Sequence, residues 1–160
     1  MFNERRFKIG ILLFIFTIIL FGCQNQNDNA KGPKGNLFNV FTGESESWEL
    51  SGYEIELTPH SSKFGNGTLT MKNTTDYSSD FFSFEVHATI NNNDEVMQKH
   101  QLSGEQVNIA TKKIGTIEGN ELPSKNGDYI SINDLSDIYM IIKWNDQQGN
   151  KKEERINFIK

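Results

Sequence analysis

The sequence predicts an all-β domain, with an immunoglobulin-like β-sandwich of about seven to nine strands as the first choice. Three observations lead to this prediction. Apolar and polar residues alternate over most of residues 37 to 160, which is the period of a half-buried strand. Turn residues interrupt the alternation about every 8 to 12 residues. No stretch keeps its apolar residues at helical spacing for three turns. A small β-barrel is the alternative architecture.

The first strands are predicted between residues 37 and 57. Residues 37 to 42 alternate, and Gly43 to Ser45 form a turn. The apolar positions are then even up to residue 50 and odd from residue 53. A slip of one residue beside Gly52 is typical of a β-bulge. Residues 59 to 67 hold Pro, Ser and a Gly-Asn-Gly turn, so they are predicted as a break before a short strand with Leu69 and Met71.

Residues 82 to 90 form the strongest predicted strand. Every apolar residue of this run lies on one face and every polar residue on the other. A strand with one uninterrupted apolar face is expected at the centre of a sheet. The apolar face consists of Phe82, Phe84, Val86, Ala88 and Ile90.

The second half of the chain is predicted from weaker signals. Residues 91 to 94 form a turn by composition, followed by a strand over 96 to 102 and a separate segment that begins at Gly104. Lys112 and Lys113 are expected in a turn, and residues 123 to 128 in a loop. Ser131 and Asp134 have the spacing of a capped helical turn.

The closing strands are predicted at residues 138 to 144 and 155 to 159. We predict that the two strands pair with Met140 opposite Ile156 and residue 138 opposite residue 158. This register buries the apolar side chains of both strands and leaves residues 146 to 150 as the loop. This register sets Lys143 opposite Glu153 on the outer face. The register also places Tyr139 and Ile141 on that outer face, and it sets Ile141 opposite Arg155. Either a neighbouring loop covers them, or they form a strip that binds a protein partner.

The N-terminal residues 1 to 22 are predicted as a helical signal peptide. Arg5, Arg6 and Lys8 precede an apolar run that extends to Phe21. A run of about 13 residues fits a signal peptide and is shorter than the roughly 17 to 25 residues of a membrane span. The small residue Gly22 then precedes Cys23, the single Cys of the chain.

Leu20-Phe21-Gly22-Cys23 resembles the lipobox of bacterial lipoproteins. The resemblance implies cleavage between Gly22 and Cys23 and a diacylglyceryl group on the Cys23 thiol. Two acyl chains give stable membrane attachment, here to the outer, extracytoplasmic face of the cell membrane. An uncleaved N-terminal anchor and ordinary secretion with a free thiol are the alternatives.

The segments around residues 48 to 57 and 142 to 156 resemble uncharacterised small membrane lipoproteins of low-GC, Bacillus-like Gram-positive bacteria. This resemblance implies a location and a fold, but no chemistry. Residues 23 to 36 then form the lipidated Cys and a flexible tether, because Ala30 is the only apolar residue between 24 and 36. Residues 37 to 160 form the sandwich domain.

Charge and cysteine content restrict the partners. The chain has 16 basic and 21 acidic residues, and residues 1 to 22 hold three of the basic ones and one of the acidic ones. The mature chain therefore carries a net charge near −7, which opposes binding to nucleic acid. With Cys23 acylated, no thiol remains for a disulfide.

No residue pattern indicates catalysis or a cofactor. Neither G-x-S-x-G nor S-x-x-K occurs with its companion residues. His60, His87 and His100 do not have the spacing of metal ligands. The acidic loops at 91 to 95 and at 76 to 80 lack the EF-hand pattern. Asn66 and Asn73, which match a glycosylation pattern, are interpreted as turn residues.

The sequence therefore predicts a non-catalytic binding or interaction domain that a lipid holds at the membrane. A protein of the cell envelope is the expected partner, with Tyr139 and Ile141 as the expected contact residues. The alternatives are an enzyme or accessory factor that acts on envelope material, and an ion- or solute-binding lipoprotein. We expect no metal and no cofactor.

Overall fold

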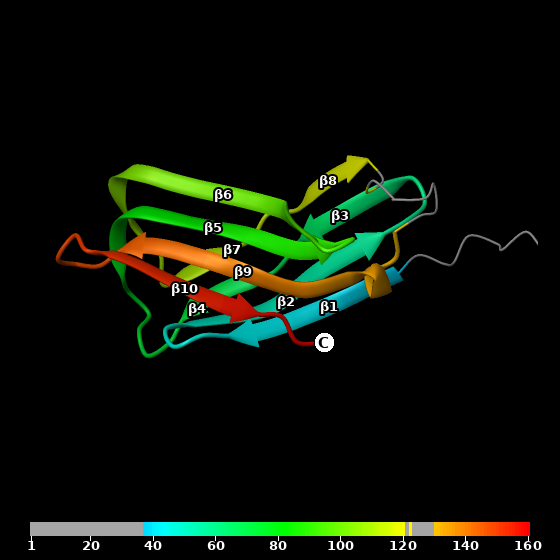
Figure 1. Ribbon diagram of the computed structural model, residues 1–160. Coiled ribbons are helices and arrows are strands. Elements are labelled where there is room, and N and C mark those ends of the chain that lie inside the picture. The colour runs from blue at the N-terminus through cyan, green and yellow to red at the C-terminus, as the bar shows by residue number, and fades with distance from the viewer. Residues whose placement is uncertain (1–36, 121, 123–129) are drawn as a thin grey trace, which may run out of the picture. The chain divides into compact units, whose positions relative to one another are not determined.

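The computed structural model describes residues 37–120, 122 and 130–160. These residues form ten strands and one 3-10 turn. The strands make two antiparallel sheets that face each other across a shared core, which confirms the predicted all-β sandwich (Figure 1). The predicted signal peptide, the predicted tether with Cys23 and the predicted loop at 123–128 lie outside the described residues.

The four-stranded sheet has the order β10-β9-β5-β6. The strand predicted to be central, β5, is an inner strand, and all five apolar residues of its alternating run are buried. The same order is found for the G, F, C and C′ strands of an immunoglobulin variable-type sheet. The strands are β5 (Ser78–Ile90), β6 (Asn93–Asn108), β9 (Leu135–Asn145) and β10 (Lys151–Asn157).

Strand β2 organises the six-stranded sheet. It pairs with β1 along one edge, and with β4 and then β3 along the other. Strand β7 extends this sheet beyond β4, and β8 extends it beyond β3. The strands are β1 (Leu37–Glu44), β2 (Trp48–Leu57), β3 (Ser61–Gly65), β4 (Thr68–Met71), β7 (Thr111–Lys113) and β8 (Ile117–Asn120).

The predicted bulge in β2 is confirmed. Phe41 of β1 pairs with Tyr53, and Gly43 pairs with Leu50, so β2 holds one residue more than β1 between these two pairs. Gly52 takes a positive φ of 65° at this point, a conformation that a residue without Cβ adopts freely. The extra residue lets the even apolar positions before it and the odd ones after it face the same core.

The predicted break over residues 59–67 is wrong, because β3 lies within it. The hydroxyl of Thr58 accepts hydrogen bonds from the amides of His60 and Ser61, at 3.2 and 2.9 Å, and so reverses the chain at once. Ser62 and Phe64 then point inward and are buried. A serine at an inward position hides the alternation that marks a strand.

Two predicted turns also differ from the structure. Lys112 and Lys113 lie in β7, which tolerates two charged residues because it is an edge strand. The turn after β5 contains only Asn91 and Asn92, both at positive φ, 52° and 64°, as a two-residue hairpin turn with the right twist requires. Asn93 already begins β6.

Strand limits shift at two further places. Strand β1 continues to Glu44, so its turn begins at Ser45 and not at Gly43. Strand β6 continues through Gly104, where φ is +116° and the pairing with β5 shifts register. The two segments predicted on either side of Gly104 are therefore one long strand. This merger lowers the strand count by one, but β3 and β7, which were predicted as a break and a turn, add two, so ten strands form where seven to nine were predicted.

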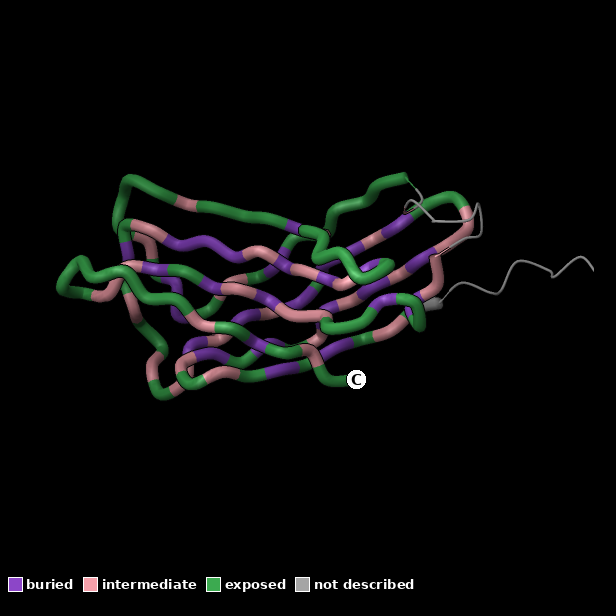
Figure 2. The backbone as a smooth tube through the Cα atoms, viewed as in Figure 1, coloured by how far each residue is buried: buried purple, intermediate pink, exposed green. Residues whose placement is uncertain are grey.

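Buried residues from both sheets form the core (Figure 2). The ring of Trp48 from β2 lies 5.7 Å from that of Phe82 and 5.6 Å from that of Trp144, centroid to centroid, so it joins the two sheets. Phe158, which follows β10, contacts Tyr53 of β2 at 5.1 Å. Each such aromatic pair adds about 0.5 to 1.5 kcal/mol beyond the burial of its area.

The terminal hairpin has the predicted register. Ile156 pairs with Met140, and both are fully buried. The amide of Phe158 donates to the carbonyl of Ile138 at 2.9 Å, so these two residues also face each other as predicted. The loop over residues 146–150 is confirmed, because Asn145 and Lys151 are the last pair of the hairpin.

The helical turn before β9 is also present, as a 3-10 turn over Ile132–Asp134. The carboxylate of Asp134 accepts hydrogen bonds from the amide and the hydroxyl of Ser131, at 2.8 and 2.6 Å. The Ser131 and Asp134 side chains therefore meet as predicted, with the hydroxyl as a donor to the carboxylate.

The two sheets stay separate and do not form a closed barrel. In the described ranges, strand-type pairing between them is confined to Thr42 and Ile159, whose amides donate to each other's carbonyls at 2.9 and 2.7 Å. This contact ties β1 to the chain that follows β10. The small barrel considered as an alternative is therefore not the observed fold.

A buried polar bridge joins β6 to the other sheet. The hydroxyl of Tyr53 donates to Oε1 of Gln98 at 2.7 Å, and Nε2 of Gln98 donates to the carbonyl of Gly115 at 2.8 Å. Tyr53 is fully buried and Gln98 nearly so. Burial raises the pKa of the Tyr53 hydroxyl far above its usual range, so the group stays a donor.

Candidate functional site

The outer face of the four-stranded sheet carries Tyr139 and Ile141, the residues predicted to bind a partner. Tyr139 lies between two side chains. His87 of β5 stacks on its ring at 4.8 Å with an angle of 11° between the planes, and the guanidinium of Arg155 from β10 lies 3.6 Å from the ring centroid. This layered arrangement combines π-stacking with a cation–π contact. We call these three residues the Tyr139 stack.

Hydrogen bonds fix the Tyr139 stack from its ends. The hydroxyl of Tyr139 donates to Oδ1 of Asp94 at 3.1 Å, while Oδ2 of the same carboxylate lies 2.9 Å from Nδ1 of His87. Arg155 donates from Nη2 to Asp137 at 2.7 Å. Partial burial, and then the hydrogen bond to Asp94, raise the pKa of Tyr139. The stack is therefore a pre-assembled unit.

Ile141 lies beside the Tyr139 stack, between ion pairs. It pairs across the sheet with Glu85 on one side and with Arg155 on the other. Glu85 is bound to Lys99 with an N–O distance of 2.6 Å, and this hydrogen bond holds the pKa of the Glu85 carboxyl below its usual range. The predicted pair of Lys143 and Glu153 follows at 3.2 Å.

The structure shows how two large apolar side chains are accommodated on an outer face. Tyr139 and Ile141 are both half-buried. The contacts of Tyr139 come from side chains of the same sheet and its β5–β6 hairpin, with Asp94 at the start of β6. Among the described residues, side chains of the same sheet therefore pack against this strip. The face then has an apolar centre and a rim of paired charges, which is the anatomy of many protein interfaces.

The other residues considered from the sequence lie apart. His60 lies in the turn before β3, and His100 is exposed on β6, where its ring lies 5.5 Å from Phe84. Asp76, in the link before β5, accepts a hydrogen bond from Asn108, and Asp80, which lies in β5 and not in a loop as predicted, accepts one from Asn145. Within the described ranges, no group of three His, Cys, Asp or Glu side chains is placed to hold a metal ion.

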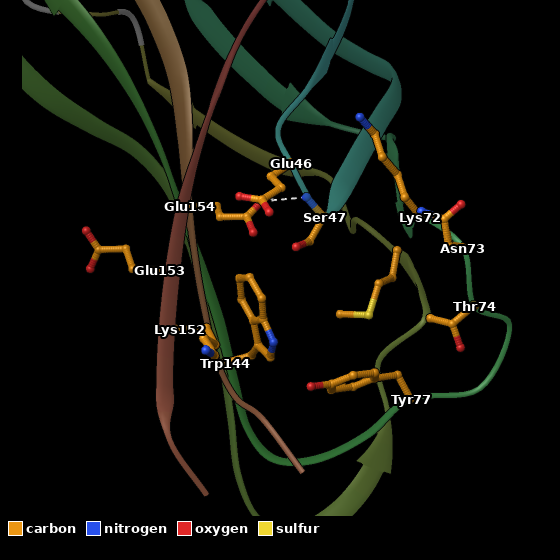
Figure 3. A pocket seen from close by; sticks show the side chains of 11 residues that line it. Glu46, Ser47, Lys72, Asn73, Thr74, Tyr77, Trp144, Lys152, Glu153 and Glu154 are labelled. Carbon is orange, nitrogen blue, oxygen red and sulfur yellow. Dashed lines mark hydrogen bonds between the residues drawn. The ribbon is translucent and has the colours of Figure 1, made fainter. Parts of the chain in front are cut away.

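A second feature, which the sequence did not indicate, is a groove of about 700 Å³ at one end of the sandwich (Figure 3). Three parts of the chain form it: the turn between β1 and β2, the link between β4 and β5, and the hairpin of β9 and β10. No local pattern signals it, because these parts are up to about 110 residues apart. We call it the end groove; its residues include Ser47, Met71, Thr74, Tyr77, Trp144 and Glu154.

Glu154 is held at one end of this groove. Its Oε2 accepts a hydrogen bond from the amide of Ser47 at 2.9 Å, as Figure 3 shows. Partial burial raises the pKa of this carboxyl, but the hydrogen bond from Ser47 and the polar surroundings at Ser45 outweigh it, so the net pKa lies below the usual range. The groove therefore contains a fixed carboxylate that is charged at neutral pH.

In the part of the chain that the structure describes, no helix has the length and the apolar character needed to cross a membrane. Gly22 and Cys23 lie outside that part, so the predicted cleavage and lipidation sites have no structural description.

The described residues thus define an antiparallel two-sheet β-sandwich with an end groove and with an outer face that has a small apolar centre among paired charges. Comparisons with protein-family models, with curated proteins and with solved structures gave no significant match to this chain.

Proposed function

We propose that this protein is a lipid-anchored binding protein on the extracytoplasmic face of the cell membrane, and that its sandwich domain binds a protein of the cell envelope without catalysing a reaction. Support for the anchor comes from the basic flank, the short apolar run and the Gly22-Cys23 pair. The acyl chains on Cys23 would attach the domain through the tether of residues 24 to 36, whose root-mean-square reach is about 20 Å.

The Tyr139 stack is the observation that supports binding by the outer face. An aromatic side chain contributes most to an interface when its position is fixed before the partner arrives, since less conformational entropy is then lost. His87 and Arg155 hold both faces of the Tyr139 ring, and Asp94 holds its hydroxyl. Its edge and the neighbouring Ile141 form the apolar centre that a partner would cover.

The paired charges around this centre favour a partner with charges of both signs. Lys99 with Glu85, Lys143 with Glu153, and Arg155 with Asp137 border the strip. Satisfied ion pairs at a rim exclude water from the centre and contribute little to affinity themselves. They restrict which partners fit, because a like charge placed opposite any of them is unfavourable.

Lipidation is tested by growing cells with an alkyne-tagged fatty acid and comparing the wild type with Cys23→Ala. We expect label on the wild type and none on the variant, and the variant in the soluble extracellular fraction. Label that persists on Cys23→Ala would exclude the proposed anchor.

Binding by the outer face is tested with a photo-crosslinking amino acid at position 141 in membranes of the native host. We expect a discrete crosslinked product at this position, and its loss when Tyr139 is also replaced by Ala. The matched control is the same amino acid at Val40, an exposed β-branched residue on the outer face of the other sheet. Equal products at positions 40 and 141 would contradict the proposal.

A further inference from the structure

We propose that the end groove is a binding site for a saccharide chain. This site is separate from the Tyr139 stack, so the proposal does not depend on the function of the outer face. Its volume of about 700 Å³ lies within the range of about 300 to 1,000 Å³ that is usual for small-molecule sites.

Aromatic and thioether side chains form the apolar part of the end groove. Trp144 and Met71 are nearly buried, with 4% and 6% of their surfaces exposed, so they form its floor, while the half-buried Tyr77 forms a wall. Figure 3 shows the Tyr77 and Trp144 side chains on opposite sides of the space. A pyranose ring has apolar C–H faces that can pack on an aromatic ring. Its hydroxyl groups, at the edge of the ring, stay free to form hydrogen bonds.

Hydrogen-bond donors and acceptors surround this apolar part. Glu154 supplies a charged acceptor and Asn73 an amide that both donates and accepts. The Thr74 hydroxyl is already bonded to the backbone of Asp76, at 2.8 and 3.3 Å, so it shapes the groove and is not counted as a ligand group. Sugar hydroxyls donate to carboxylates and accept from amides, so they can pair with Glu154 and Asn73 without leaving a buried charge unpaired. The Glu153 carboxylate, by contrast, points away from the space in Figure 3.

The charges of the end groove argue against other ligand classes. Both lysines that line it are already paired, Lys72 with Glu44 at 2.7 Å and Lys152 with Asp146 at 3.6 Å. With Glu154 ionised, the groove offers no net positive charge to a phosphate or nucleic acid. A hydrocarbon chain would leave these polar groups desolvated and without partners, which is unfavourable.

The wall that carries Tyr77 is held in place by β6. The amide of Tyr77 donates to Oδ1 of Asn108 at 3.4 Å, its carbonyl accepts from the amide of Ile109 at 2.7 Å, and Nδ2 of Asn108 donates to Asp76 at 3.0 Å. The link between β4 and β5 is thus anchored at the point where it borders the groove. A preformed wall reduces the entropy lost when a ligand binds.

Isothermal titration calorimetry of the full-length chain, in a detergent without a sugar headgroup, tests this proposal. The probes are β-1,4-linked N-acetylglucosamine tetrasaccharide and cellotetraose, with choline chloride and inorganic phosphate as the other arms. We expect saturable binding of at least one tetrasaccharide and none of choline or phosphate. Tyr77→Ala should weaken saccharide binding at least about tenfold, and Glu154→Gln should weaken it several-fold.

Two matched variants control for indirect effects. Phe38→Ala removes an exposed aromatic residue, and Glu56→Gln neutralises a carboxyl, both on the outer face of the six-stranded sheet away from the groove. Both should bind saccharide as the wild type does, and near-ultraviolet circular dichroism should show that every variant is folded. Binding of choline or phosphate in place of saccharide, no saccharide binding at millimolar probe, or equal affinities for Tyr77→Ala and Phe38→Ala would each overturn the proposal.

Discussion

The polar bridge at Gln98 makes a sharp prediction about stability. In Gln98→Met the buried hydroxyl of Tyr53 and the carbonyl of Gly115 both lose their partner. An unsatisfied buried group costs about 1 to 3 kcal/mol. Tyr53 is fully buried, whereas Gly115 is exposed, so its carbonyl can bind water in place of Gln98. Met fills a volume similar to that of Gln, so no large cavity forms, and we expect the free energy of unfolding to fall by about 1 to 3 kcal/mol.

The companion variant Tyr53→Phe removes the hydroxyl and leaves only Oε1 of Gln98 without a donor, so we expect a loss of about 1 to 2 kcal/mol. In the double variant both members of this hydrogen bond are absent. Its stability should equal or exceed that of Gln98→Met alone, which gives a coupling energy of about 1 to 2 kcal/mol between the two sites.

Urea unfolding followed by tryptophan fluorescence measures these differences, because Trp48 and Trp144 both lie in the core. The slope of free energy against urea should stay constant across the four proteins, which indicates that the comparison is between similar native states. Additive losses in the double variant would show that water reaches the Tyr53 hydroxyl, and that the bridge does not join β6 to the other sheet.

Three further predictions concern the core, a close backbone contact and acid. Phe84→Ala, at a buried position, should lower stability by about 3 to 5 kcal/mol; a loss below about 1 kcal/mol would mean that the ring is not in the core. Gly65→Ala should lower the free energy of unfolding by more than about 2 kcal/mol, because φ is +132° and a Cβ would lie 2.8 Å from Cα of Thr116. A Cβ at Gly115 would meet open space, so Gly115→Ala should leave the thermal unfolding temperature nearly unchanged. Hydrogen bonding holds the pKa of the Glu154 carboxyl below its usual range. The stability that this carboxylate provides should therefore be complete at neutral pH and be lost as the pH falls through and below that usual range. Glu154→Gln should flatten this decline in urea titrations at each pH.

The sequence alone was enough to predict the sandwich, the central strand and the terminal hairpin. In each case one strand face is continuously apolar, so a slip by one residue would expose the whole set, and only one register buries it. The run from Phe82 to Ile90 and the pairing of Met140 with Ile156 follow from this rule. The bulge at Gly52 could also be predicted from the sequence, because an extra residue in one strand changes the buried positions from even to odd. A glycine at this point adopts the positive φ of the bulge without strain.

The tertiary structure decided the features that depend on contacts between distant residues. Strand β3 has a serine at an inward position, which becomes acceptable only because Ser62 can donate to the carbonyl of Asn120 at 2.9 Å. Gln98 looks like a surface residue in the sequence, and its burial depends on Tyr53, 45 residues away. The end groove joins Ser47 to Glu154, 107 residues apart. Periodicity reports which face of a strand is buried, but the partner that satisfies an inward polar group is set by how the two sheets are brought together.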